Sequence, residues 1–392
     1  MKTKIDLLVF PKNKSELKKF LKKNDNVDYA VISNSLNILS YCIQKKIKFF
    51  SFNDIVDIDL YKKICINSYL QRFNKFKDKV SINYFFIFKY NFSHIIRTLF
   101  LSKLLIDGLN KKFEFKKIKL FSFPYNFTYA RSNIFDFLRL LLSLEFNNKL
   151  QKKHINFFIL KFIVFNFKLA NLFSEFIFFF EFLFYKIYYF KKKSKVKFKK
   201  NSKSIFFFSS GTDFTFHSKL SRYITEFNPI CFKGKSKFNR FEKNTFNSIH
   251  SIQFNLLNGF YYKKIINNYN YNFLNKIFED FIENDLIKDY YIQYAKFRIK
   301  RDFKFINSFA FLLNNKKPDL VFSSSLSLPL ISAKFLNIRS ISEFEGYGID
   351  QNPMAPYIGD YVFLGGDHCE DEFIEYKSGN GKVIKNGVYY IE

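Results

Sequence analysis

The sequence has no tryptophan, little glycine or proline, and too few cysteines for a disulfide framework. Its four cysteines are far apart and form no CxxC pair, which excludes a disulfide scaffold and a zinc ribbon and indicates a reducing compartment. Twelve glycines and seven prolines are too few for collagen or a flexible low-complexity chain. With 392 residues, of which 48% are hydrophobic, the chain is long enough for two or three domains with their own cores.

Arginine is also scarce. Only nine of the 64 basic residues are arginine, whereas phenylalanine occurs 59 times. Phe, Lys, Asn and Ile share A/T-rich codons, so this composition is typical of an AT-rich bacterial genome. Part of the net charge of +30 therefore reflects codon usage. Because a basic surface attracts polyanions whatever its origin, nucleic acid, an anionic membrane and phosphorylated small molecules all stay open as partners.

The common catalytic fingerprints are missing. The sequence contains no GxxxxGK[ST], GxGxxG, GxSxG or HExxH motif, and its five histidines show no metal-ligand spacing. Metal-dependent hydrolysis and P-loop phosphoryl transfer are therefore not indicated. We expect neither a metal site nor a bound cofactor.

Short apolar runs alternate with helical patterns in both ends of the chain. In the first 125 residues, strands are predicted at 5–10, 27–33, 48–52 and 118–123. Helices are predicted between them at 15–23, with Ser15 as the N-cap, at 36–45 and at 61–109.

From residue 204 onward the same alternation returns. Strands are predicted at 204–209, 229–232, 317–325, 338–342, 360–365 and 382–386. Helices are predicted at 217–225, 326–336 and 369–376, with a further helical region before Asn315. Strands that alternate with helices are typical of parallel sheets covered by helices, so the expected fold class is α/β with Rossmann-type parallel sheets.

Residues 126–203 differ from the two α/β regions, 1–125 and 204–392. Ile155–Phe190 is predicted to be a long, aromatic-rich helical insertion, and seven lysines follow it within residues 191–200. A membrane-spanning helix needs about 20 apolar residues. Charges interrupt every such window here, at Lys161, Lys168, Glu175, Glu181 and Lys186. At about 100° per residue, all of them except Glu181 fall on a polar stripe about 40° wide.

Three interpretations of this segment stay open. A narrow polar stripe on an aromatic-rich helix beside a polybasic run is typical of a helix that lies in the membrane interface, and we favour this interpretation. The second is a long core helix followed by a solvated lysine loop. A membrane-spanning helix is the least favoured of the three.

Polar and glycine residues follow several predicted strands, at the edge where open α/β sheets bind ligands. Backbone N–H groups and hydroxyls that precede a helix suit a phosphate or carboxylate. The candidate anion contacts of this kind are Ser210, Gly211, Thr212, Ser324 and Ser325. The same residues also fit ordinary capped turns between a strand and a helix. His217 is a candidate general base, although a single histidine is more often structural.

The last 75 or so residues carry an ordered series of motifs. These are Lys317-Pro-Asp-Leu-Val-Phe, a serine turn, a helix, Asn337-Ile-Arg-Ser-Ile, a polar loop with Gly346, Asp360-Tyr-Val-Phe-Leu-Gly365 and Lys382-Val-Ile-Lys-Asn-Gly387. The series resembles the GT-B glycosyltransferase-like proteins of bacterial surface-polysaccharide synthesis, including the CDP-glycerol glycerophosphotransferase and capsule-synthesis relatives. It covers about a fifth of the chain.

The resemblance implies a GT-B-like fold and a metal-independent glycosyltransferase or polyol-phosphate transferase of cell-envelope polysaccharide synthesis. Such an enzyme takes a nucleotide-activated donor and a lipid-linked or glycan acceptor. It would be a cytoplasmic protein, peripheral on the inner face of the cell membrane. Glu345 stands where the family commonly has the histidine of a His-Gly pair. This makes Glu345 the first candidate for the acceptor base and His217 the second, with Gly346 in the donor site.

Two other functions stay open. The chain ends at Glu392, near the point where the family's donor-binding half usually begins, so a truncated or accessory protein that needs a partner chain is one alternative. A nucleic-acid-binding protein is the other, suggested by the net charge of +30 and an aromatic content of 21%. The absence of an RNP-type or helix-turn-helix signature weakens this second alternative.

Overall fold

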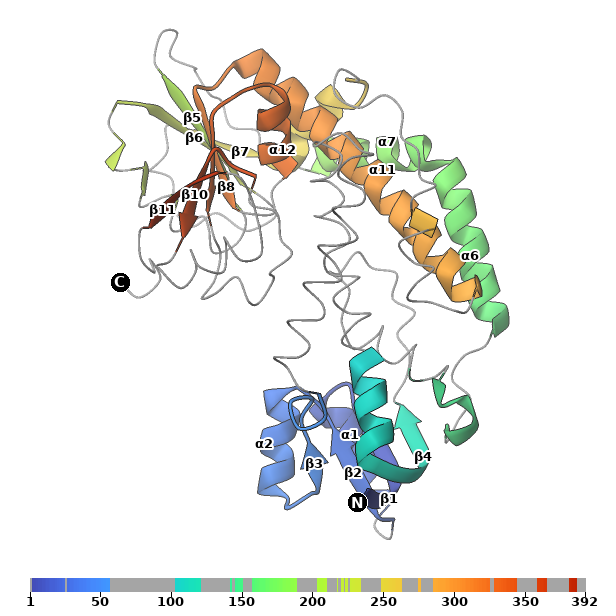
Figure 1. The fold of residues 1–392 in the computed structure, drawn as a ribbon. Coiled ribbons are helices and arrows are strands. Elements are labelled where there is room, and N and C mark those ends of the chain that lie inside the picture. The colour runs from blue at the N-terminus through green and yellow to red at the C-terminus, as the bar shows by residue number, and fades with distance from the viewer. Residues whose placement is uncertain are drawn as a thin grey trace. The chain divides into compact units, whose positions relative to one another are not determined.

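The chain forms two compact units, and the described residues of each contain a parallel sheet (Figure 1). Unit 1 consists of Met1–Phe73, His94–Phe165 and Glu279–Ile287, and unit 2 of Asn74–Ser93, Asn166–Phe278 and Lys288–Glu392. The computed structural model describes residues 2–24, 27–56, 103–120, 142, 145–150, 157–188, 203–209, 217, 220, 221, 223, 224, 226–233, 248–262, 274, 275, 285–324, 328–343, 358–364 and 381–385.

The described part of unit 1 is built on a four-stranded sheet. Its strands are β1 (Thr3–Phe10), β2 (Tyr29–Ile32), β3 (Phe49–Phe50) and β4 (Phe113–Leu120). Their order is β3-β2-β1-β4, and every pair is parallel. Leu7, Leu8 and Val9 pair with β2 on one side and with β4 on the other, and all three are buried. Burial on both faces explains why the centre of β1 is a continuous apolar run instead of an alternating one.

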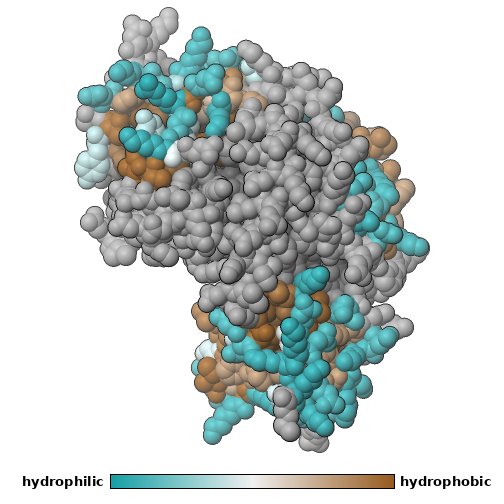
Figure 2. All heavy atoms as spheres, viewed as in Figure 1, coloured by the Kyte–Doolittle hydropathy of each residue, from teal (hydrophilic) through white to brown (hydrophobic). Residues whose placement is uncertain are grey.

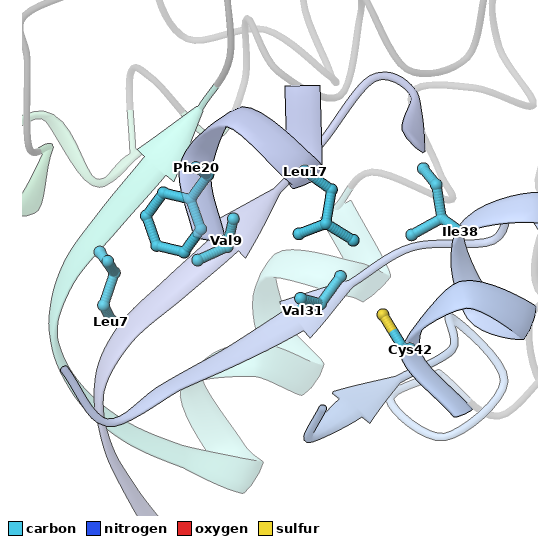
Figure 3. Packing of buried hydrophobic residues seen from close by; sticks show 7 residues of the cluster. All are labelled: Leu7, Val9, Leu17, Phe20, Val31, Ile38 and Cys42. Atoms are coloured by element: carbon cyan, nitrogen blue, oxygen red, sulfur yellow. The ribbon is translucent and has the colours of Figure 1, made fainter. Parts of the chain in front are cut away.

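Two helices cover one face of this sheet. They are α1 (Lys14–Leu21) and α2 (Leu36–Gln44). Figure 3 shows how side chains from both helices meet those of β1 and β2 in one buried cluster, made of Leu7, Val9, Leu17, Phe20, Val31, Ile38 and Cys42. Residues 103–112 form a further helix, which leads directly into β4. A short 3-10 helix, η1 (Asn147–Lys149), lies in the same unit.

The N-cap of α1 is Asn13, and the prediction of Ser15 was wrong. The Asn13 side chain accepts a hydrogen bond of 2.9 Å from the backbone N–H of Glu16. The Glu16 carboxylate in turn accepts one of 2.9 Å from the backbone N–H of Lys12. These two bonds resemble a capping box, in which residues three apart satisfy free N–H groups at a helix start. The position of Glu16, three residues after Asn13, therefore favours Asn13 as the N-cap. Asn13 lies two residues after Pro11, which ends the preceding strand.

The thiol of Cys42 lies in the core of unit 1, and burial raises its pKa from 9.0 to about 11. Only the thiolate reacts with alkylating agents, so a raised pKa lowers the reactive fraction. We expect iodoacetamide at about pH 8 to modify Cys42 roughly 100-fold more slowly in the folded protein than in urea, judged from the thiolate fraction. Peptide-resolved mass spectrometry measures both rates. Equal rates would show that this core is open to solvent.

The described part of unit 2 is built on a seven-stranded parallel sheet. Its order is β11-β10-β9-β8-β5-β6-β7. The strands are β5 (Ser204–Ser209), β6 (Asn228–Lys233), β7 (Ser248–Ser251), β8 (Leu320–Ser324), β9 (Ser340–Glu343), β10 (Tyr361–Leu364) and β11 (Lys382–Lys385). The chain adds β6 and β7 on one side of β5 and then returns to add the other strands on the opposite side. The order therefore reverses between β5 and β8.

Both faces of the seven-stranded sheet are covered. On one face, Phe207, Cys231 and Phe322 are buried beneath Leu220 and Ile224, which follow β5. The other face carries Phe206, Phe208 and Phe232, all buried. There the ring of Phe208 meets Phe309 of the long helix α11 (Asp285–Lys316), with the ring centroids 5.5 Å apart. The helix α12 (Leu328–Phe335) joins this layer, because Ser332 donates a hydrogen bond to the carbonyl of Ile306.

The predicted aromatic-rich helix consists of two helices, α6 (Phe157–Leu172) and α7 (Ser174–Tyr188). The carbonyl of Asn171 accepts hydrogen bonds from the side chains of Ser174 and Lys300. Side-chain donors that occupy a backbone carbonyl interrupt the helical hydrogen-bond ladder and bend the helix. This accounts for the break at Phe173, which the hydrophobic pattern alone did not predict.

Four of the five charged residues of this segment contact other parts of unit 2. Lys168 pairs with Asp289 at 2.6 Å, and Glu175 pairs with Lys304 at 2.5 Å, both partners lying on α11. The Glu181 carboxylate accepts two hydrogen bonds from Arg301, at 3.0 and 2.5 Å. Lys186 bonds the Asn258 side chain on the 3-10 helix η4 (Leu257–Gly259), which follows α9 (Ile252–Leu256). Most charged side chains of the segment therefore have protein partners, although those of Lys168 and Glu175 are still 53% and 70% exposed.

The predicted α/β class with parallel sheets is confirmed. Most strands lie within two residues of their predicted positions, although β4 begins five residues early and β7 was not predicted. The predicted helix at 369–376 and most of the one at 61–109 lie outside the described residues. Among the described residues, no helix is long and apolar enough to cross a membrane.

Candidate functional site

Three neighbouring strands of unit 2 end in polar residues at the same level. Phe208, the residue before Ser209, pairs with Ser323, and Ser324 pairs with Glu343. Ser209, Ser324 and Glu343 are the last residues of β5, β8 and β9. The strand order reverses between β5 and β8, and open α/β sheets bind ligands outside the carboxyl ends of strands at such a reversal.

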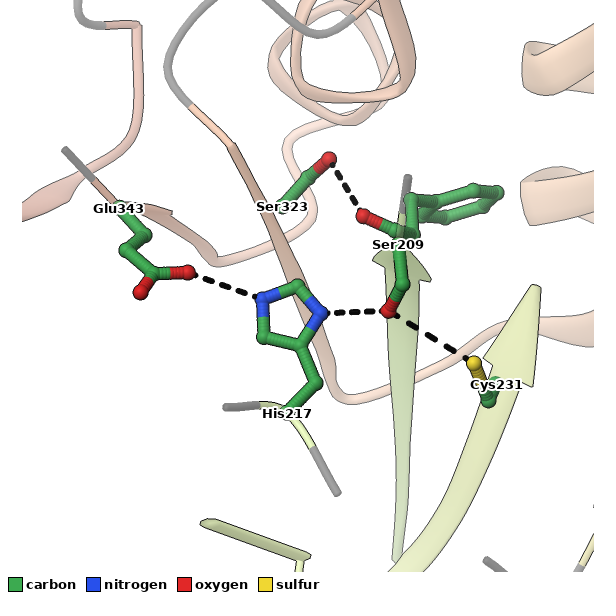
Figure 4. Close-up of polar contacts among 6 residues, drawn as sticks. Ser209, His217, Cys231, Ser323 and Glu343 are labelled. Atoms are coloured by element: carbon green, nitrogen blue, oxygen red, sulfur yellow. Dashed lines mark hydrogen bonds and ion pairs between the residues drawn. The ribbon is translucent and has the colours of Figure 1, made fainter. Parts of the chain in front are cut away.

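His217 joins the ends of β5 and β9 (Figure 4). Its Nδ1 lies 2.5 Å from Ser209 Oγ, and its Nε2 lies 3.0 Å from Glu343 Oε2. Cys231 extends the chain of contacts, since its Sγ lies 3.6 Å from Ser209 Oγ. On β8 beside it, the Ser323 hydroxyl donates to the carbonyl of Phe208 at 3.1 Å. We call Ser209, His217 and Glu343 the Ser–His–Glu array.

The array is buried beneath the end of the sheet. Ser209, His217 and Glu343 are exposed by only 1%, 0% and 1%. The imidazole also packs against two aromatic side chains, with its centroid 5.4 Å from the ring of Phe207 and 5.0 Å from that of Phe322. Burial of polar groups is costly unless they are hydrogen-bonded, so both ring nitrogens need the partners that they have.

The hydrogen bonds of the array define a direction. A neutral imidazole donates from one nitrogen and accepts at the other. With Nε2–H donating to the Glu343 carboxylate, Nδ1 accepts the hydroxyl proton of Ser209. Ser209 Oγ then accepts from the Cys231 thiol. This is the polarity of a Ser–His–acid triad, with the two ring nitrogens exchanged relative to the serine-protease arrangement.

The burial of the array limits its access to a substrate. A nucleophilic serine must reach the reacting carbon of its substrate, and Ser209 is 1% exposed. His217 likewise accepts a proton from a substrate only if Ser209 gives up its place at Nδ1. We therefore interpret the array as structural: it holds the ends of β5 and β9 in place. The segments that follow these strands then begin at fixed positions.

The structure brings some of the predicted site residues together. Ser324 ends the strand next to β5, and His217 contacts the last residues of β5 and β9. The other predicted site residues lie outside the described part of the chain: Ser210, Gly211, Thr212, Ser325, Glu345 and Gly346. By sequence, they directly follow the adjacent strands β5, β8 and β9.

Ser209 and Glu343 were not predicted as partners of His217. Each is the polar last residue of its strand, and β9 itself has only one apolar residue, so their place at a strand end was the signal that the sequence offered. In the described part of the chain, no group of three or more His, Cys, Asp or Glu side chains is arranged to hold a metal ion. No protein-family model, curated protein or solved structure matches this chain.

Proposed function

We propose that this chain is a GT-B-like transferase of cell-envelope polysaccharide synthesis. The donor would be a nucleotide-activated sugar or polyol phosphate, and the acceptor a lipid-linked or growing glycan. One observation carries the proposal: in unit 2, the candidate anion-binding residues follow adjacent parallel strands at the point where the strand order reverses. Nucleotide ligands bind at this place in open α/β sheets. The separate parallel sheet of unit 1 supports a GT-B-like organisation.

In this proposal, the three segments after β5, β8 and β9 form the donor site. Backbone N–H groups and hydroxyls of Ser210–Thr212 and Ser324–Ser325 bind the donor phosphates, as anion sites at strand ends do. Gly346 lets the backbone approach the donor closely. Glu345 takes the acceptor proton, and the Ser–His–Glu array positions the start of the segment that carries Glu345. His217, the second candidate for the base, takes that proton only if Ser209 leaves its Nδ1.

The transfer step needs no metal. The acceptor hydroxyl oxygen forms a bond to the anomeric carbon of a sugar donor, and the bond from that carbon to the nucleoside diphosphate breaks. The diphosphate leaves with the electron pair, and the acceptor proton goes to Glu345. With a polyol-phosphate donor, phosphorus is attacked and a nucleoside monophosphate leaves. Fixed N–H groups and lysines stabilise the leaving anion, as preorganised electrostatics do in many enzymes.

The test is release of free nucleotide from a panel of nucleotide-activated sugars and polyols. The purified chain is incubated with each donor in EDTA, with and without membrane lipid extract as the source of acceptor. We expect one donor class to give acceptor-dependent release that EDTA does not abolish. Absence of binding and release with every donor would contradict the proposal. If DNA or RNA were instead bound with an affinity that falls steeply with salt, the nucleic-acid alternative would be favoured.

A further inference from the structure

A continuous apolar stripe lies on the surface of unit 2, along α7 and the end of α6. Its side chains are 39% to 74% exposed, and large apolar side chains with such exposure are unusual when they gather in one place. We define the aromatic stripe as Leu169, Leu172, Phe173, Phe176, Phe180, Phe184, Ile187 and Tyr188. Most of the spacings are three or four residues, which keeps these side chains on one side of the helical segment.

The opposite side of α7 is packed into unit 2. Phe178 and Phe182 are fully buried, and the ring of Phe182 lies 5.5 Å from that of Phe260 and 5.0 Å from that of Phe305 on α11. The mostly buried ion pair of Glu181 and Arg301 holds the same side of α7 against α11. These contacts fix the orientation of α7, so the stripe stays outward and does not compete for the core.

The stripe is about as large as the largest apolar patch on a typical monomeric protein, roughly 300–600 Å². At the exposures given above, its five aromatic side chains present on the order of 500 Å² of apolar area, if a full ring residue offers 150–250 Å². Phe176 and Phe180 are in ring contact at 4.5 Å, and Phe184 stacks on Tyr188 at 5.8 Å. Hydrophobic surface is visible in Figure 2 at the edge of the molecule where Figure 1 draws α6. Patches of this size are often functional.

The sequence beside the stripe indicates what covers it. Seven lysines lie within residues 191–200, and no acidic residue occurs between Phe182 and Lys200. In the sequence, the first of these lysines follows Tyr188, the last residue of α7, by only three residues. An occupant must therefore be apolar where it meets the stripe and negatively charged beside it. A bilayer with anionic headgroups has both properties.

We propose that the aromatic stripe docks unit 2 on an anionic membrane surface. The rings enter the boundary between headgroups and acyl chains, and the adjacent lysines bind the headgroups. The sequence predicted an interfacial helix whose charged stripe faces water. In the structure, most of those charged side chains contact α11 or η4, and the membrane-facing surface is the aromatic stripe instead. This inference goes beyond the proposed transferase activity and does not depend on it.

Flotation of the full chain with lipid vesicles tests the proposal. The vesicles contain phosphatidylcholine with or without phosphatidylglycerol. We expect binding to anionic vesicles, and a loss of about tenfold or more when Phe176, Phe180 and Phe184 are replaced by asparagine, because binding scales with buried apolar area. Replacing the seven lysines, Lys191, Lys192, Lys193, Lys195, Lys197, Lys199 and Lys200, by glutamine should remove the preference for phosphatidylglycerol.

Matched controls separate the stripe from general hydrophobicity and charge. Leu36, Ile43 and Tyr223 are 82%, 64% and 83% exposed away from the stripe, and their asparagine variant should bind like the wild type. A second control replaces seven lysines elsewhere by glutamine: Lys2, Lys4, Lys19, Lys22, Lys23, Lys45 and Lys48. This variant should keep most of the preference for phosphatidylglycerol vesicles. Circular dichroism checks that each variant is folded.

Two results would overturn the proposal. One is a folded wild type that does not float with anionic vesicles. The other is a wild type that is dimeric in analytical ultracentrifugation and becomes monomeric when the stripe is substituted, with vesicle binding unchanged. In that second case the stripe would be an interface between two copies of the chain.

Discussion

Glu345→Gln is expected to lower turnover by about 10²–10⁴-fold, the range typical for loss of a general base. Glutamine has nearly the same shape as glutamate but cannot take the acceptor proton. Glu345 lies two residues after β9, so the substitution leaves the described sheet untouched. The affinity for the donor should therefore stay nearly unchanged, and kcat should carry the whole loss. Steady-state kinetics with the donor identified in the nucleotide-release assay measures both.

Glu226→Gln is the matched control for this prediction. Glu226 is an exposed carboxylate in the same unit, just before β6, and it lies at the opposite end of the sheet from the proposed donor site. Its substitution should leave kcat within about twofold of the wild type, as expected for a surface position away from the reacting groups. If Glu345→Gln were as active as this control, the role carried over from the resembled family would be wrong.

His217→Ala is expected to destabilise unit 2 by about 3–5 kcal/mol. The substitution removes hydrogen bonds from two buried groups, Ser209 and Glu343, and leaves a cavity beside two phenylalanine rings. Each of these losses costs roughly 1–3 kcal/mol, and more if the buried group is charged. Urea unfolding measures the loss of unfolding free energy. Hydrogen exchange of peptides from β5 and β9 shows whether the loss is located at these strands.

Tyr223→Ala is the control for the buried array. Tyr223 follows His217 by six residues in the sequence but is 83% exposed, so its loss should cost less than about 0.5 kcal/mol. Glu343→Gln should be milder than His217→Ala, because an amide fills the same space and can still bond the imidazole. A His217→Ala protein as stable as Tyr223→Ala would show that the array does not hold the strand ends together.

The α/β class could be predicted from the sequence because its strongest signals are local. Apolar runs such as Ile205–Phe208 are buried on both faces of a parallel sheet, and they stand out even in a phenylalanine-rich chain. β7, with the sequence Ser-Ile-His-Ser, has only one apolar residue, so no pattern distinguished it from a loop. Hydrogen bonding to β6 makes this segment a strand although its own composition does not favour one.

The Ser–His–Glu array could not be predicted, because its members are brought together by strand order. His217 and Glu343 are 126 residues apart, and they meet only because β9 lies next to β8 and β8 next to β5. The break between α6 and α7 has a similar origin, because Lys300, which lies on α11 and 129 residues away in the sequence, donates a hydrogen bond to the Asn171 carbonyl. Such tertiary contacts leave no periodic signal in the sequence.

Hydrogen exchange with and without donor tests the central claim most directly. The claim is that the donor binds at the carboxyl ends of β5, β8 and β9 in the seven-stranded sheet. Peptides that cover Ser209–Thr212, Ser324–Ser325 and Glu343–Gly346 should exchange more slowly when the donor is present, and peptides of β1 and β2 should change little. Protection confined to unit 1, or no protection with any donor that binds, would contradict the account.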